Sequence, residues 1–291
     1  MNEKGYRLLK VDVPSGEAQN VADWLVKKTK LPVLEQEVSG IVRLTASLER
    51  LDSLESLLVR ESVKSMGAIE ATDEFLPGED WETLWKSQGF QRFLVNHWLS
   101  IIPEWDTDPK PATPFIRIHP HLAFGTGLHE TTGKCLSLLV DYYPRVPVEG
   151  GKILDFGSGT GILGIAALVL GHGDFLVAVD NDPLAVEATL ENLELNGLKQ
   201  FSKTGLSPET PGDGSPFGND GKFRLIIANV TGGVLVNWIP YLWELLEPGG
   251  AMVLSGISTR ERKKVEEILP APRSFHKAKK FHTFWLRKAD F

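Results

Sequence analysis

The chain has 291 residues, of which 42% are apolar and 24% are charged, and its formal net charge is −7. This length suggests one large or two modest domains with an ample core. The acidic balance argues against direct nucleic-acid binding, and a single cysteine excludes an internal disulfide framework. Because no signal segment and no run of 18 apolar residues is visible, we expect a cytoplasmic protein without a membrane span.

Residues 1–75 predict an N-terminal ferredoxin-like α+β domain. Strand and helix patterns follow one another there in the order β-α-β-β-α-β, the split βαβ arrangement. The expected elements are a strand at 6–13, a helix at 17–28, strands at 33–38 and 41–47, a helix capped by Asp52 that ends near Gly67, and a strand at 68–75. No catalytic constellation is visible, so we interpret this domain as a substrate-recognition module. A purely structural appendage is the alternative.

Residues 76–114 are interpreted as a linker region. Leu76-Pro77-Gly78 breaks the preceding pattern, and residues 79–88 predict a short helix with two tryptophans one turn apart. Extended stretches at 93–102 and 115–119 flank a turn rich in proline. The linker predicts two domains that are joined by a hinge.

Residues 115–291 predict a Rossmann-like α/β domain. Strands and helices alternate regularly, which is typical of a parallel, doubly wound sheet, and two closing strands predict an antiparallel edge. We expect helices at 131–142, 162–170, 183–196, 234–246 and 260–269, and strands at 153–155, 175–179, 224–229, 251–255, 272–278 and 281–287. The stretch 198–222 is rich in Gly, Pro, Ser and Asp, and its pattern places no strand.

Residues 153–161, Ile-Leu-Asp-Phe-Gly-Ser-Gly-Thr-Gly, form the most informative motif of the chain. An apolar strand ends in Asp155, three alternating glycines precede a helix, and the next strand ends in Asp180. Such a β-α-β unit binds a nucleoside-sized ligand over the carboxyl edge of the sheet.

Two ligands compete for this motif. Residues 159–164 fit the G-x-G-x-x-G of dinucleotide binders, which place a pyrophosphate at a helix N-terminus. Asp155 would oppose a pyrophosphate, whereas S-adenosylmethionine offers an amine to this carboxylate and ribose hydroxyls to Asp180. The residues therefore favour S-adenosylmethionine, and glycines that only shape a turn are the third possibility.

Residues 119–132 form a second glycine-containing stretch, just before an expected helix. Backbone amides around Phe124-Gly125-Thr126-Gly127 can surround a ligand carboxylate, and the hydroxyl of Thr131 or Thr132 can assist. A loop that only caps the helix, with Thr131 as the N-cap, is the alternative.

These two motifs stand in order with Asp-x-Asp-Pro-x-Ala at 180–185 and Ala-Asn-Val at 228–230. Over nearly the whole chain this pattern closely resembles the ribosomal protein L11 methyltransferases (the PrmA family), class I enzymes that use S-adenosylmethionine. The resemblance implies methylation of lysine side chains and an N-terminal amine of ribosomal protein L11, which the small domain would hold. His119 and His121 depart from the acid and the glycine that many members have there.

The resemblance and the motifs together define the candidate site. The predicted cofactor contacts are Phe124, Gly125, Thr126, Gly127, Thr132, Asp155, Gly157, Gly159, Gly161, Asp180, Asn181 and Asn229. Asn229 is also the predicted catalytic residue, because its side-chain carbonyl can orient an attacking amine without repelling a sulfonium, with the Val230 backbone as a second acceptor. The alternative for Asn229 is a turn residue before two glycines.

No metal site is expected, because His119, His121, His129 and Cys135 have no compact ligand spacing. Cys135 lies in an apolar helical pattern, which indicates a buried structural thiol. Three rival functions remain at this stage: a methyltransferase of the same fold that acts on another protein or a small amine, a non-catalytic ribosome-binding factor and, last, a nicotinamide oxidoreductase.

Overall fold

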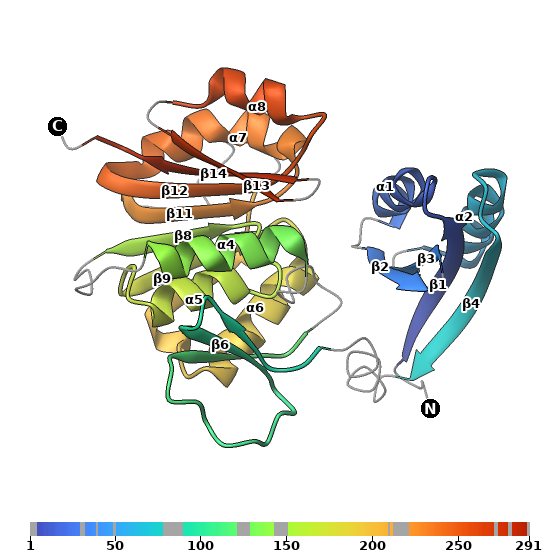
Figure 1. Ribbon diagram of the computed structural model, residues 1–291, viewed down its shortest axis with the longest axis horizontal. Helices are drawn as coiled ribbons and strands as arrows, with labels where there is room; N and C mark the ends of the chain where they lie inside the picture. Colours follow the sequence, from blue (N-terminus) through green and yellow to red (C-terminus); the bar gives the residue numbers. More distant parts are fainter. Residues whose placement is uncertain are drawn as a thin grey trace. The chain divides into compact units, whose positions relative to one another are not determined.

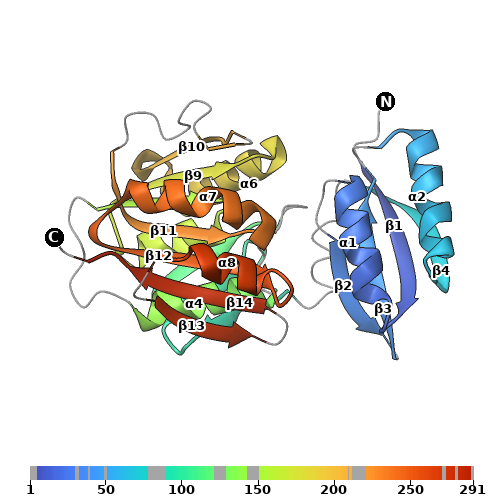
Figure 2. The same ribbon diagram turned by 90° about the horizontal axis from the view of Figure 1, so that it is seen from above.

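The chain divides into two compact units, Met1–Gly89 and Phe90–Phe291, each with its own buried core (Figures 1 and 2). The computed structural model describes residues 5–29, 33–38, 40–48, 51–77, 90–120, 129–142, 151–208, 210–211, 221–270, 273–278 and 281–289. Among the described helices, none is long and apolar enough to cross a membrane.

The first unit has the predicted β-α-β-β-α-β order. Its elements are β1 (Gly5–Pro14), α1 (Ala18–Thr29), β2 (Val33–Val38), β3 (Ile41–Ser47), α2 (Ser53–Ser65) and β4 (Glu70–Pro77). The strands form one antiparallel sheet in the order β2-β3-β1-β4. Asp52 caps α2 as expected, because its Oδ1 accepts from Glu55 N–H (2.8 Å) while Glu55 Oε2 accepts from Asp52 N–H (3.0 Å). This unit confirms the ferredoxin-like part of the predicted fold.

A small three-stranded sheet opens the second unit. It consists of β5 (Phe93–Val95), β6 (Leu99–Pro103) and β7 (Phe115–Ile118), with β5 antiparallel and β7 parallel to β6. The expected single extended stretch at 93–102 is wrong, because the chain reverses at Asn96 and His97. Both residues have positive φ (43° and 59°), the conformation of a tight hairpin turn, and asparagine tolerates it well.

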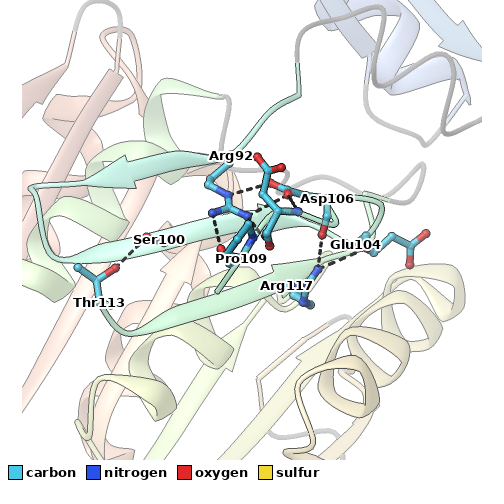
Figure 3. Close-up of polar contacts among 8 residues, drawn as sticks. Arg92, Ser100, Glu104, Asp106, Pro109, Thr113 and Arg117 are labelled. Atoms are coloured by element: carbon cyan, nitrogen blue, oxygen red, sulfur yellow. Dashed lines mark hydrogen bonds and ion pairs between the residues drawn. The ribbon is translucent and has the colours of Figure 1, made fainter. Parts of the chain in front are cut away.

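Arg92 ties this small sheet to the loop that precedes β7 (Figure 3). Its guanidinium forms a bidentate pair with Asp106, with Nε–Oδ2 and Nη2–Oδ1 distances of 2.8 and 2.9 Å, and its Nη1 donates to the Pro109 carbonyl (3.0 Å). Arg117 of β7 donates to the Asp106 carbonyl (2.9 Å). These contacts fix the segment that leads toward residue 120.

A seven-stranded sheet is the centre of the second unit. Its order is β10-β9-β8-β11-β12-β14-β13, parallel from β10 to β12 and antiparallel at the β14-β13 edge. The strands are β8 (Lys152–Phe156), β9 (Phe175–Asp180), β10 (Ser202–Leu206), β11 (Phe223–Asn229), β12 (Leu246–Ser258), β13 (Arg273–Ala278) and β14 (Phe281–Arg287). This topology confirms the predicted Rossmann-like sheet.

Helices cover both faces of this sheet. They are α4 (Glu130–Asp141), α5 (Ile162–Val169), α6 (Pro183–Leu195), α7 (Gly232–Leu245) and α8 (Arg262–Ile268). Helices α4, α5 and α6 pack on one face, while α7 and α8 pack together on the other (Figures 1 and 2). Central strands such as β8 and β11 are therefore buried on both sides, which explains their continuous apolar runs.

Strand β10 lies in the stretch where the sequence pattern placed no strand. It follows a short 3-10 helix (Lys199–Phe201) and pairs only with β9, at the edge of the sheet. Its residues are exposed or half-buried, so it lacks the apolar alternation by which strands are recognised.

Candidate active site

The predicted site residues gather where the strand order of the main sheet reverses. From β8 the chain runs outward to β9 and β10, and then returns to place β11 on the other side of β8. In open α/β sheets a crevice forms at this switch point, at the carboxyl ends of the strands. Asp155, Asp180 and Asn229 all stand at these ends.

The turn after β8 requires glycine for its backbone conformation. Gly157, Gly159 and Gly161 have φ values of 75°, 56° and 78°, a region that side chains rarely enter. At Gly157 a Cβ atom would also lie 2.2 Å from Val230 Cγ1, so the turn after β8 and the turn after β11 are in close contact. These glycines bring the backbone near the crevice and keep its floor open.

Asp180 supports this turn from the end of β9. Its Oδ2 accepts from Gly159 N–H (3.0 Å), and its Oδ1 accepts from Asp182 N–H (3.0 Å). Burial raises the pKa of Asp180 above its ordinary value, although these N–H donors oppose the rise. Asp182 caps α6, because its Oδ1 accepts from Leu184 N–H (3.0 Å), and Asn181 between Asp180 and Asp182 is exposed.

Asp155 is 1% exposed, and its Oδ2 accepts from Gly164 N–H (2.8 Å). Burial raises the pKa of Asp155 to about 7, opposed by this hydrogen bond and assisted by the negative charge of Asp180. Two carboxylates that are hard to ionise therefore lie close to one turn. A cationic ligand would stabilise both in their ionised form, whereas a phosphate would be repelled. The site thus fits S-adenosylmethionine, with its ammonium and sulfonium groups, and does not fit a pyrophosphate.

Asn229 and Thr132 meet although 97 positions separate them. Asn229 Nδ2 donates to Thr132 Oγ1 (3.2 Å), which joins the end of β11 to the first turn of α4. Asn229 Oδ1 is buried and has no hydrogen-bond partner among the described residues. A buried acceptor without a donor costs free energy, about 1–3 kcal/mol, so this atom is available to accept a hydrogen bond from a ligand.

The turn after Asn229 is held by two neighbours that sequence reasoning missed. A Cβ atom on Gly256 of β12 would lie 2.5 Å from the Val230 carbonyl oxygen, so this carbonyl faces β12, and only glycine fits there. Glu261 Oε1 accepts from Gly233 N–H (2.9 Å), and its Oε2 accepts from Ser258 N–H (3.1 Å). Glu261 thereby caps the N-terminus of α7 from a distant part of the chain. No local pattern signals such a cap.

The alternative in which Thr131 is the N-cap is wrong. Helix α4 begins at Glu130, and its N-cap is His129, whose Nδ1 accepts from Thr131 N–H (3.3 Å). Thr131 is buried inside the first turn. The imidazole of His129 can serve as the cap because a neutral ring nitrogen accepts a hydrogen bond as a hydroxyl oxygen does. Burial lowers the pKa of His129 and so favours this neutral form.

The predicted residues Phe124, Gly125, Thr126 and Gly127 lie outside the described residues, as does His121. His119 contacts Glu104, and no group of three potential metal ligands occurs in the part of the chain that the structure describes. Cys135 is fully buried, and burial raises the pKa of its thiol to about 12, which suits a structural side chain and not a nucleophile.

The fold and this crevice define a class I methyltransferase architecture. The family model of ribosomal protein L11 methyltransferase (PrmA) matches residues 9–287, and the chain belongs to this family. The resemblance that the motifs carry is thereby confirmed.

Three similar proteins illustrate the relationship. The ribosomal protein L11 methyltransferase of Marinobacter nauticus is 33% identical over 233 residues, 78% of this chain and 72% of that protein. The protein of the same name from Pelobacter propionicus is 37% identical over 220 residues, 74% of this chain and 68% of that protein. The crystal structure of the ribosomal protein L11 methylase from Lactobacillus delbrueckii subsp. bulgaricus superposes with a TM-score of 0.56 at 30% identity, covering 68% of this chain and 99% of that one.

Proposed function

We propose that this chain transfers methyl groups from S-adenosylmethionine to lysine and N-terminal amines of ribosomal protein L11. The observation that carries the proposal is the buried Oδ1 of Asn229 at the switch point of the sheet, which has no hydrogen-bond partner in the part of the chain that the structure describes. Membership in the PrmA family supports the reaction and the protein substrate.

The residues around the crevice suit the parts of S-adenosylmethionine. Asp180, with Asn181 beside it, would accept from the ribose hydroxyls, and Asp155 would face the methionyl ammonium. Gly157, Gly159 and Gly161 would let the backbone approach the ligand closely, and Thr132 would add a hydroxyl. Residues 124–127 are predicted to surround the methionyl carboxylate. S-Adenosylmethionine supplies a methyl group on a sulfonium, which is electrophilic without help from a metal or a nucleophilic side chain.

The chain's own task is to orient the attacking nitrogen. A neutral amine carries N–H donors, and Asn229 Oδ1 can accept one of them and so direct the lone pair. Asn229 Nδ2 donates to the Thr132 hydroxyl, and Asn229 Oδ1 has no partner among the described residues. The Val230 carbonyl, which lies close to Gly256, would be a second acceptor for the amine.

The domain roles belong to the same proposal. Residues 1–75 would hold the protein substrate, residues 76–114 would link the two functional parts, and residues 115–291 would carry the reaction. A ribosomal protein substrate is consistent with action in the cytoplasm. The mildly acidic chain suits a basic substrate, and no direct contact with nucleic acid is required.

Two measurements test this function. Calorimetric titration with S-adenosylhomocysteine, run beside NADH, should give saturable binding of the first ligand alone; binding of NADH alone would refute the proposed ligand. Transfer of a radiolabelled methyl group to separated ribosomal proteins should label ribosomal protein L11. Label on another protein would mean that the substrate is that protein and not ribosomal protein L11. Ligand binding without transfer to any ribosomal protein would favour a non-catalytic ribosome-binding factor.

A further inference from the structure

Asn192 of α6 is a fully buried polar side chain (0% exposed) that makes three hydrogen bonds to backbone groups. Its Oδ1 accepts from His119 N–H (2.7 Å), and its Nδ2 donates to the His119 carbonyl (3.0 Å) and to the Thr160 carbonyl (2.9 Å). One side chain therefore binds two segments that lie 41 positions apart in the sequence, since residues 119 and 160 are both its partners.

Both partner segments belong to the candidate site. Thr160 stands between Gly159 and Gly161 in the turn after β8, and His119 directly follows β7, at the start of the predicted glycine-containing stretch 119–132. The side chain of Thr189, one turn earlier on α6, also supports the glycine turn, because its hydroxyl donates to the Gly159 carbonyl (2.9 Å). Two polar side chains of α6, Thr189 and Asn192, thus donate hydrogen bonds to carbonyl groups of the glycine turn.

Asn196, one turn further along the helix, makes a similar but separate set of contacts. Its Oδ1 accepts from Arg117 N–H (2.8 Å), and its Nδ2 donates to the Arg117 carbonyl (2.7 Å). Among the described residues, none of its hydrogen bonds reaches the glycine turn. The two asparagines both dock the β7 segment on α6, and only Asn192 couples that segment to the glycine turn.

We propose that Asn192 is a positioning residue for the bound cofactor, because it holds His119 and the Thr160 backbone of the glycine turn at a set distance from each other. This inference rests on the proposed function, in which the glycine turn contacts S-adenosylmethionine. A backbone cradle binds tightly only when its parts are held in place before the ligand arrives. Asn192 performs this role without touching the ligand.

The test compares Asn192→Ala with Asn196→Ala. Each variant loses an asparagine that pairs with the β7 segment, so both are expected to lower Tm. The dissociation constant for S-adenosylhomocysteine, measured by calorimetry well below Tm, should rise by roughly ten- to a hundredfold in Asn192→Ala and by less than about twofold in Asn196→Ala. In turnover, KM for S-adenosylmethionine should rise in Asn192→Ala while KM for the protein substrate stays unchanged.

Asn192→Asp provides a second variant that keeps the shape of the side chain and the acceptor for His119 N–H. It replaces the Nδ2 donor to the His119 and Thr160 carbonyls with a carboxylate oxygen. It should therefore raise the dissociation constant for S-adenosylhomocysteine, as Asn192→Ala does. Equal affinities in the Asn192 and Asn196 variants, or wild-type affinity in either Asn192 variant, would overturn the inference while leaving the proposed function intact. A wild-type chain that does not bind S-adenosylhomocysteine would overturn both.

Discussion

Asn229 Nδ2 donates a hydrogen bond to Thr132 Oγ1, so the amide nitrogen, and not the amide oxygen, contacts the first turn of α4. Since the hydroxyl occupies the nitrogen, the oxygen is the end left for a ligand, and it has no partner among the described residues. An amide in the opposite orientation would present its N–H donors to the sulfonium of S-adenosylmethionine. The pair therefore gives Asn229 the polarity that an amine-orienting residue needs.

Asn229→Ala should lower kcat by about a hundredfold or more, because the attacking amine loses its alignment. The dissociation constant for S-adenosylhomocysteine should change much less than kcat. Single-turnover methyl transfer and calorimetry measure the two effects separately. Asn237→Ala, on the exposed side of α7, is the matched control and should behave as wild type. Full activity in Asn229→Ala would exclude the orienting role.

Thr132→Val should lower kcat by about tenfold, because the isosteric change removes the acceptor of a buried N–H group. Thr132→Ser keeps the hydroxyl and should retain most of the activity. The comparison isolates the hydrogen bond from the packing of this fully buried side chain. If Thr132→Ser loses activity while Thr132→Val keeps it, the methyl group matters and the hydroxyl does not.

The buried carboxyl of Asp155 should make stability depend on pH. Because burial raises the pKa of Asp155 to about 7, the folded chain retains a proton that the unfolded chain releases near its ordinary pKa of 3.8. The contribution of Asp155 to the free energy of unfolding should therefore fall as pH rises from about 4 to 7, by on the order of a few kcal/mol, and stay level above that range.

Asp155→Asn removes this titration and should gain stability relative to wild type across the same pH range. Denaturant unfolding at several pH values measures the difference, and a difference that does not change with pH would contradict the shifted pKa. The ammonium of S-adenosylhomocysteine favours the ionised carboxyl, so its affinity for wild type should increase as pH rises through about 7. The affinity of Asp155→Asn should lack this step.

Gly157→Ala should destabilise the second unit by about 3 kcal/mol, since it combines a positive φ with an overlap against Val230. Adding Val230→Ala removes the overlap but not the backbone strain, so the double variant should recover part of the loss. Gly205→Ala in β10, where a Cβ atom would meet nothing within 4 Å, is the control and should be nearly neutral. Thermal unfolding of the wild type and the three variants measures these effects. If the double variant recovers no stability, the close contact between residues 157 and 230 is not the cause of the loss.

Glu261→Ala should cost about 1–2 kcal/mol of stability, because the N-terminus of α7 loses its distant cap. Glu266→Ala removes the half-buried pair with Arg262 on α8 and should cost less than about 0.5 kcal/mol. Urea unfolding measures both. Equal costs would mean that Glu261 acts as a surface charge and not as a cap.

Local patterns predicted most of the fold. The apolar runs of β8, β9 and β11, the helical spacing of α5 and α6, and the cap of α2 at Asp52 depend on neighbours within a few positions, and the sequence pattern predicts all of them. Elements whose signal is weak or distant were not predicted. Strand β10 is an exposed edge without alternation, the 93–102 hairpin turns at two residues with positive φ, and His129 caps α4 with an imidazole.

The sequence by itself determined the order of the elements, the glycine turn and the polar residues that end its strands, because the parallel arrangement brings the carboxyl ends of neighbouring strands to one edge. Only the tertiary structure decided how those residues are used. The bond from Asn229 to Thr132, the bridge that Asn192 makes between His119 and Thr160, and the distant cap at Glu261 join residues 97, 73 and 28 positions apart. Such contacts follow from how whole elements pack, and no pattern along the chain records them.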